Sequence, residues 1–237
     1  MVILKKRVIA LFTAAVVACT TISASASTIY SHEDEFWSGK YLDNKQKNLC
    51  FFVRKSAQTS ILTKDIYNPS AWNDVSENVH VSVEFETDEN SGLVNFRNAF
   101  VLGVTSYAFG GRTVRAETCP YDQYGRPIPM NELDRDWLQI DILMNTDEKV
   151  YSEKLYSGLK DKSVVAKKTF LHEVGHSLKL QHPVENSALE EHIFSGLPLS
   201  VMNNRRPYSQ GGEIFTASEP THHDRVTLIA KWGDEVV

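Results

Sequence analysis

The chain has 237 residues, of which 42% are hydrophobic, 23% charged and 10% aromatic. This is the composition of an ordinary globular protein, and it excludes collagenous, coiled-coil and intrinsically disordered classes. Lys and Arg number 25 against 30 Asp and Glu, a formal net charge of -5. The chain therefore lacks the basic excess of nucleic-acid-binding proteins, and we expect no nucleic-acid partner. Three cysteines are too few for a disulfide scaffold, so a hydrophobic core must provide the stability.

The first residues have the pattern of an export signal. A basic cluster at 5–7 precedes an apolar run at 8–17, and Ala24-Ser25-Ala26 has the A-x-A form of a signal-peptidase site. We therefore predict a signal peptide over 1–26 and a secreted, extracellular protein. The alternative is a bacterial lipobox ending at Cys19, whose lipidation would anchor the protein at the cell surface and give it a membrane contact.

The segment that follows the signal begins with a polar, acid-rich lead-in over 27–48, which we expect to be loosely held. The predicted domain covers 49–237 and opens with a short apolar strand at 49–53. Residues 79–86 alternate apolar and polar side chains, the pattern of a half-buried strand. Residues 93–109 mix β-branched and aromatic side chains with a glycine, and this pattern fits strands as well as a helix.

The second half of the chain continues with 119–135, where three prolines and a glycine predict an irregular loop. Residues 138–144 alternate again and indicate another strand. The chain after His182 is turn-rich until 224–232, where apolar residues at helical spacing precede Gly233 as a stop signal. Strands, one central helix, an irregular segment and a closing helix together predict an α+β fold.

Three smaller features leave alternatives open or predict no site. Cys50 and Cys119 would remain after signal cleavage, and the sequence favours neither a disulfide between them nor two buried thiols. The acidic turn at 145–148 could bind calcium, but a solvated turn is the favoured interpretation. His222 and His223 are expected to be solvated rather than to bind a metal.

The most specific chemistry lies in 161–182, which reads DKSVVAKKTFLHEVGHSLKLQH. Asp161 is a predicted N-cap for a helix that extends to about Leu180. At 100° per residue, His172 and His176 project together from one side of this helix. The other side carries the apolar residues Phe170, Leu171, Val174 and Leu178.

Two imidazoles on adjacent helical turns form a chelate for a metal such as Zn²⁺. His182 follows His176 by six residues and could turn back as a third ligand, which would leave one coordination position for water. Glu173 lies about 100° from His172, close to the ion without binding it. From there its carboxylate could accept a proton from a metal-bound water and deliver it to a leaving amine.

These residues resemble a known family. HEVGHSLKLQHP is similar to the long zinc signature HExxHxxGxxH of the metzincin metalloendopeptidases, in their matrixin-like branch. The stretch 200–203 resembles the Met-turn of that family, and 220–233 is similar to its closing helix. Transferred residue by residue, the resemblance implies His172, His176 and His182 as zinc ligands and Glu173 as the general base. It also implies Met202 as the hydrophobic floor of the site.

The resemblance further implies a two-lobed catalytic domain with a twisted mixed, mostly parallel sheet, a central zinc-binding helix and a C-terminal helix. A substrate would lie extended along an edge strand, for which 139–144 is the candidate. The glycine of the family signature is replaced by Lys179, and keeping its left-handed turn would cost about 1 kcal/mol. No histidine lies between His80 and His172, so we expect one catalytic zinc and no second, structural zinc.

The sequence therefore predicts a secreted, monomeric, zinc-dependent endopeptidase that acts on protein or peptide substrates. Its specificity pocket is expected in 183–218, which is rich in apolar side chains. The competing hypothesis is a cell-surface lipoprotein that binds zinc or a partner without turnover. Glu173 separates the two, because a pure binding site has no need of a carboxylate next to its first histidine.

Overall fold

The structure is a computed structural model that describes residues 35–73, 75–92, 97–105, 108–109, 112–151, 161–182, 200–202, 209–210, 213–214 and 219–233. The predicted signal at 1–26, the alternative at Cys19 and most of the expected specificity pocket lie outside these ranges. No helix in the described ranges is long and apolar enough to cross a membrane.

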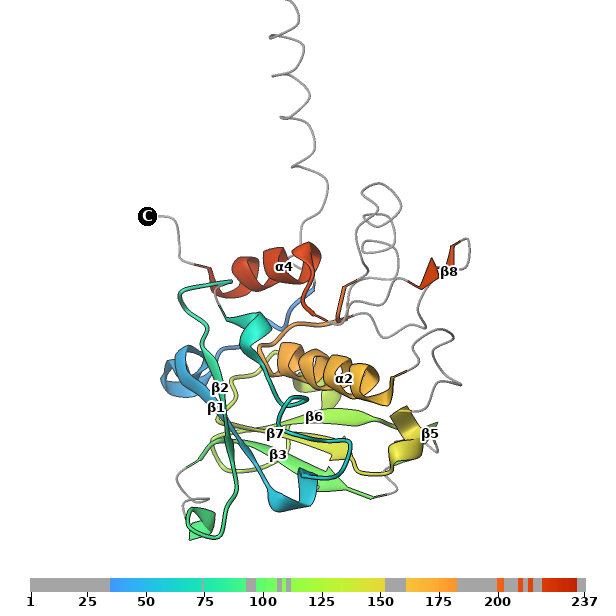
Figure 1. Ribbon diagram of the computed structural model, residues 1–237. Helices are drawn as coiled ribbons and strands as arrows, with labels where there is room; N and C mark the ends of the chain where they lie inside the picture. Colours follow the sequence, from blue (N-terminus) through green and yellow to red (C-terminus); the bar gives the residue numbers. More distant parts are fainter. Residues whose placement is uncertain are drawn as a thin grey trace, which may run out of the picture. The chain divides into compact units, whose positions relative to one another are not determined.

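The elements are shown in Figure 1. The strands are β1 (Leu49–Val53), β2 (Val81–Phe85), β3 (Ala99–Val104), β4 (Ala108–Phe109), β5 (Arg112–Thr113), β6 (Ala116–Tyr121), β7 (Gln139–Asn145), β8 (Ser209–Gln210) and β9 (Glu213–Ile214). The α-helices are α2 (Lys162–Ser177) and α4 (His222–Trp232). Short 3₁₀ turns are η2 (Leu42–Asn48), η3 (Lys55–Ala57), η4 (Ser70–Trp72), η6 (Met130–Glu132) and η7 (Glu148–Tyr151).

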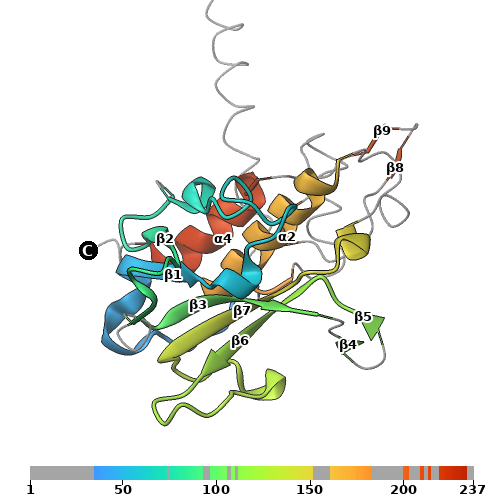
Figure 2. The same cartoon turned by 60° about the horizontal axis from the view of Figure 1, so that its bottom comes forward.

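Five strands form one mixed sheet in the order β2-β1-β3-β7-β6. β1 pairs in parallel with β2 and β3, and β3 pairs in parallel with β7. β6 pairs antiparallel with the other side of β7 and forms an edge of the sheet (Figure 2). The predicted strands at 49–53, 79–86 and 138–144 are confirmed, and the ambiguous 93–109 contributes strands. The predicted α+β class with a mixed, mostly parallel sheet is likewise confirmed.

The prediction that 139–144 is the edge strand is wrong, because β6 pairs outside it. Strand β6 was not predicted, because its last three residues fall in 119–135, where prolines indicated an irregular loop. Pro120 is tolerated in β6 because this is an edge strand, where a missing N–H can face away from the sheet. The rest of 122–135 is irregular, as expected, apart from the turn η6.

The two helices lie on the same side of the sheet (Figure 1). The side chain of Asp161 accepts a hydrogen bond from Ser163 N at 2.8 Å, which confirms the predicted N-cap of α2. Helix α4 begins with a capping box between Thr221 and Asp224 and ends at Gly233, close to the predicted bounds.

The core lies between this side of the sheet and the helices. The apolar face of α2 is fully buried, as the helical spacing predicted. Phe170 packs edge-on against Tyr67, with ring centroids 5.1 Å apart. Two tryptophans bond to the backbone at the middle and the end of the helix: Trp72 Nε1 donates to Leu171 O at 2.9 Å, and Trp232 Nε1 donates to Leu178 O at 2.7 Å. These contacts fix the helix that carries the candidate ligands.

The expectation that 27–48 is loosely held is wrong for residues 35–48. Phe36 forms an antiparallel bridge with Leu180, and Trp37 N donates to Lys179 O at 2.9 Å. Tyr41 is 3% exposed and donates to Ser177 O at 2.6 Å. Aromatic residues interspersed in a polar segment thus attach it to the end of α2.

Cys50 and Cys119 are both free, so the disulfide alternative is not realised. Cys50 lies on β1 and Cys119 on β6, with β3 and β7 between these strands. Three strand spacings amount to roughly 14 Å, about twice the Cα separation that a disulfide tolerates.

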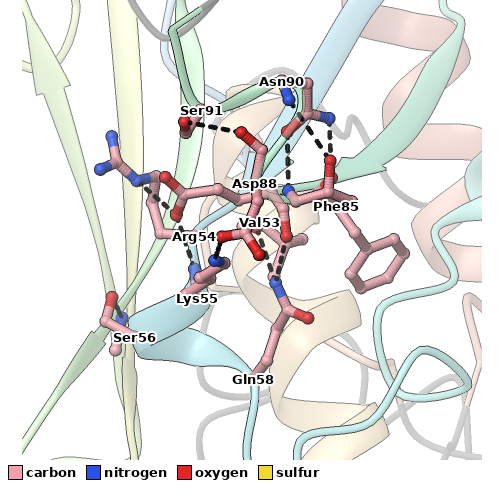
Figure 3. A network of polar contacts seen from close by, with 12 residues as sticks. Val53, Arg54, Lys55, Ser56, Gln58, Phe85, Asp88, Asn90 and Ser91 are labelled. Carbon is pink, nitrogen blue, oxygen red and sulfur yellow. Dashed lines mark hydrogen bonds and ion pairs between the residues drawn. The ribbon is translucent and has the colours of Figure 1, made fainter.

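A polar network closes the carboxyl ends of β1 and β2 (Figure 3). The carboxylate of Glu86 accepts hydrogen bonds from Arg54 Nε at 3.0 Å and Lys55 N at 2.8 Å. Lys55 also forms an ion pair with the exposed Asp88, and Gln58 Nε2 donates to Val53 O at 3.3 Å. Exposed ion pairs of this kind contribute about 0–1 kcal/mol each, so we interpret the network as a loop clamp rather than a binding site.

Candidate metal centre

His172, His176 and His182 are brought together as the sequence predicted. His182 Nε2 lies 3.1 Å from His172 Nε2 and 3.1 Å from His176 Nε2. Four tetrahedral ligands at about 2.0 Å from Zn²⁺ would be separated by about 3.3 Å, close to these distances. The three nitrogens therefore have the spacing of ligands to one small cation.

Backbone carbonyls orient two of the three rings. His172 Nδ1 lies 2.9 Å from Val201 O, and His176 Nδ1 lies 2.8 Å from Leu180 O. A carbonyl can only accept a hydrogen bond, so each Nδ1 carries the proton and each Nε2 presents a lone pair. The carbonyls thus select the tautomer that binds a metal.

The three Nε2 atoms cannot all be satisfied by hydrogen bonds to one another. His182 can offer one Nε2 proton at most, yet it faces two Nε2 acceptors at the same distance. A shared cation satisfies all three nitrogens at once. Burial lowers the pKa of His176 to about 3 and lowers those of His172 and His182, so the rings stay neutral and available as ligands. The donor set therefore fits a borderline metal such as zinc.

The third ligand reaches the site through a left-handed turn at Lys179. This residue has φ +68°, and it is the one non-glycine residue with positive φ in the described ranges. Lys179 N donates to His176 O at 2.8 Å, and Leu180 N donates to Gly175 O at 3.0 Å. These two bonds form a Schellman motif, which ends α2 at Ser177 instead of near Leu180 and turns the chain back towards the helix. The turn predicted from the family signature is kept despite the missing glycine.

Contacts of the Lys179 side chain offset the strain of this turn. The side chain is fully buried, and its Nζ donates to Arg135 O at 2.9 Å and Leu133 O at 3.3 Å. Nζ also lies 3.8 Å from the ring centroid of Trp137, a close cation–π contact. Burial lowers the pKa of Lys179 to about 7. A glycine would remove the strain together with all of these contacts.

Met202 lies against helix α2, which carries the candidate ligands His172 and His176. A Cβ atom added to Gly175 would approach Met202 Sδ to 2.2 Å, so the sulfur rests directly on the helix backbone between the turns of His172 and His176. Met202 is 2% exposed. Its position agrees with a hydrophobic support, while the role implied by the resemblance remains a prediction.

Asp224 holds the segment that carries Met202, a function that the sequence reasoning missed. Its buried carboxylate accepts hydrogen bonds from Val201 N at 2.9 Å, from Thr221 N at 2.7 Å and from the Ser200 hydroxyl. Because Val201 O contacts His172, Asp224 connects helix α4 to the first ligand. The sequence shows that Asp224 can cap a helix, but it gives no sign that the same carboxylate also bonds to Ser200 and Val201.

Glu173 is 6% exposed and faces the edge strand β6. Thr118 Oγ1 lies 2.7 Å from Glu173 Oε2 and 3.1 Å from Glu173 O. It therefore holds the carboxylate close to the backbone of the same residue. Burial raises the pKa of Glu173 to about 7, and the Thr118 hydrogen bond opposes this shift. A cation nearby would also oppose this shift and lower the pKa of Glu173. Thr118 was also missed, since nothing in the sequence distinguishes it from other strand threonines.

The N-terminal segment 35–37 lines the same region. Gln181 N, one residue before the third ligand, donates to Glu35 O at 2.7 Å. The Trp37 ring lies 5.5 Å from that of His176. The Glu35 carboxylate pairs with His223 at 2.8 Å, and both side chains are buried. The prediction that His223 is solvated is therefore wrong, because a residue outside the predicted domain covers it.

The turn at 145–148 is built from local hydrogen bonds. Asn145 Oδ1 accepts from Asp147 N at 2.9 Å, and Asp147 Oδ1 accepts from Lys149 N at 3.0 Å. Within the described ranges, the three histidines are the one group of His, Cys, Asp or Glu side chains with metal-binding spacing. Asp147 is exposed, as expected for a solvated turn, whereas Asn145 is fully buried.

Comparison with known proteins provides no family for this chain. No protein-family model matches it, and no curated protein matches it. The functional interpretation therefore depends on the chain's own residues and their geometry.

Proposed function

We propose that the protein is a secreted zinc endopeptidase of the metzincin type that hydrolyses protein or peptide substrates as a monomer. The observation that carries the proposal is the convergence of three imidazole Nε2 atoms on one point, two of them from helix α2, which also carries the buried Glu173 next to His172. A five-stranded mixed sheet with an antiparallel edge strand next to that helix agrees with the fold implied by the resemblance.

The chemistry follows from the residues around the site. A zinc ion held by His172, His176 and His182 would supply a Lewis acid that polarises a peptide carbonyl and acidifies a water molecule. Glu173 accepts the proton of the attacking water and delivers it to the leaving nitrogen. Thr118 keeps the Glu173 carboxylate in place for both transfers.

The alternative is a zinc- or partner-binding lipoprotein anchored through Cys19. Glu173 weighs against it. A buried carboxylate next to a ligand costs stability, and a site that only stores a metal gains nothing from an additional proton acceptor. The hydrogen bond from Thr118 fixes the position of this carboxylate, which suits a group that must meet a substrate-bound proton.

The test separates metal binding from chemistry by substituting Glu173→Gln, which keeps the shape of the side chain and removes the basic carboxylate. We expect zinc content near that of the wild type and cleavage of a generic protein substrate reduced by about 10²–10⁴-fold. His176→Ala should instead lose the metal, because two histidines bind zinc much more weakly than three. Glu219→Gln, which removes an exposed carboxylate paired with Lys167, is the matched control and should leave both properties unchanged.

Two results would contradict the proposal. Near-full activity of Glu173→Gln at full zinc occupancy would refute the assigned base. A zinc-loaded wild type that cleaves no peptide, tested with and without a chelator, would favour the binding lipoprotein.

A further inference from the structure

The outer side of β6 offers backbone hydrogen-bonding groups at alternate residues only. Arg115 O accepts from Asn145 N and Tyr121 O accepts from Leu138 N, so the odd-numbered residues of β6 face β7. Backbone groups alternate along a strand, and the even-numbered residues Ala116, Thr118 and Pro120 therefore face outwards. This is the side on which a peptide could add to the sheet (Figure 2).

The carboxyl end of this outer side is already occupied. After Tyr121 the chain folds back, so that Ile128 N donates to Pro120 O at 2.9 Å and Asp122 N donates to Arg126 O at 3.0 Å. Tyr121 and Pro127 form the antiparallel bridge between these bonds. Residues 126–128 thus lie where the next part of an added strand would lie, and Pro120 has no N–H to offer.

The amino end of the outer side remains open in the part of the chain that the structure describes. No described residue bonds the outward N–H and C=O groups of Ala116 or Thr118. Thr118 is also the residue whose hydroxyl contacts Glu173. The open pairing position is therefore at the candidate general base, and the occupied position at Pro120 lies two residues, or about 7 Å, further along the strand.

From this arrangement we infer that the edge of β6 is a peptide groove closed at one end, an inference that rests on the proposed function. The groove accepts about two substrate residues on the amino side of the cleaved bond, whereas on the carboxyl side no described residue occupies the edge at Ala116. The amino side is the closed one because an added strand pairs best antiparallel, and its amino end then points towards Pro120. The favoured substrates are chains cleaved near a free amino terminus, which release short amino-terminal fragments.

The turn 122–126 gives a way to open the groove. Asp122 Oδ1 accepts from Tyr124 N at 2.8 Å and Arg126 N at 3.0 Å, and its other oxygen accepts from Arg126 Nε at 2.9 Å. Gly125 supplies a positive φ of 71° to the same turn. Removing the Asp122 carboxylate should release the hairpin from β6 without touching the metal ligands.

The experiment measures binding and does not depend on turnover. Two ladders of alanine peptides carry a zinc-chelating hydroxamate, one at the carboxyl end and one at the amino end. The first ladder therefore extends along the amino side of the site and the second along the carboxyl side. Affinities for one to four residues are measured by calorimetry on zinc-loaded Glu173→Gln protein, which we expect to bind without cleaving.

On the amino side we expect affinity to rise up to two residues and then to stay within twofold. On the carboxyl side it should rise by about two- to tenfold for the residue that pairs with Ala116, and this rise should be the same in the hairpin variants. In Asp122→Ala the third and fourth amino-side residues should begin to raise affinity. Arg126→Ala removes only the exposed guanidinium, so the third and fourth amino-side residues should raise affinity less than in Asp122→Ala. This variant also keeps the test valid if Asp122→Ala does not fold. Lys55→Ala, in the loop clamp that follows β1, is the control and should leave both ladders unchanged.

The outcomes separate the two proposals. A further rise in affinity from the third and fourth amino-side residues on the unaltered hairpin would overturn the closed groove while leaving the zinc site intact. An unchanged amino-side plateau in two folded hairpin variants would also overturn it. If neither ladder showed zinc-dependent binding, the proposed function itself would fail, and the inference with it.

Discussion

Asp224→Ala should weaken both the fold and the metal centre. Asp224 is 1% exposed, and the substitution leaves the N–H groups of Val201 and Thr221 without acceptors. An unsatisfied buried donor costs about 1–3 kcal/mol, so two of them predict a loss of about 2–6 kcal/mol in the free energy of unfolding. The hydroxyls of Ser200 and Thr221 can reorient, and we assign them no further loss.

Asp224→Asn refines this expectation. The amide oxygen can still accept from Val201 N and Thr221 N, while the new NH₂ group can donate to the Ser200 hydroxyl that formerly donated to the carboxylate. The loss should therefore be about 1–2 kcal/mol, since mainly the charge is removed. Glu219→Gln, an exposed carboxylate two residues before this helix cap, should change stability by less than about 0.5 kcal/mol.

Urea denaturation of the metal-free proteins measures the stability, and competition with a chromophoric chelator measures the zinc affinity. Because Val201 O orients His172, we expect Asp224→Ala to reduce zinc affinity by about 10–100-fold. Stability within 1 kcal/mol of the wild type, or an unchanged zinc affinity, would refute the connection between helix α4 and the first ligand.

Three further predictions concern neighbouring parts of the molecule. Gly175→Ala should lower stability by about 1 kcal/mol in urea denaturation, because crowding against Met202 Sδ and Trp72 Cζ2 outweighs the gain in helix propensity; adding Met202→Ala should relieve the closer of these two contacts. The Arg126 side chain lowers the pKa of Asp122 to about 2, so its stabilisation should be lost as the pH falls from about 4 towards 2; Asp122→Asn should show a smaller acid-induced loss over that window. Elemental analysis of the purified protein should find one zinc per chain, and two would contradict the absence of a structural site.

The sequence predicted the parts of this structure that depend on local periodicity. Helix α2 was predictable because its apolar face, its Asp161 cap and the spacing of His172 and His176 all lie within about twenty residues. Strands β1 and β7 were predictable because they are apolar or alternating runs. The family signature even indicated the turn at Lys179, although glycine is absent there.

What failed depends on contacts between distant segments. The order of β6 and β7 in the sheet depends on which strands pair, which the sequence does not show. Pro120 indicates a loop in the sequence, and only the structure shows that its backbone faces away from β7. The bonds of Asp224 to 200–202 and of Glu35 to His223 join segments more than twenty residues apart. Thr118 contacts Glu173 because β6 lies next to helix α2, and no local sequence pattern could have identified this contact.

The placement of the three histidines within one helix and its turn has a consequence for folding. All three lie within eleven residues, so a short stretch of unfolded chain already holds the complete ligand set. Metal binding to the unfolded state reduces the stabilisation that the ion gives to the folded state. Zinc should therefore raise the melting temperature less than its affinity alone would suggest, and a chelator should abolish activity well before the sheet and its core unfold.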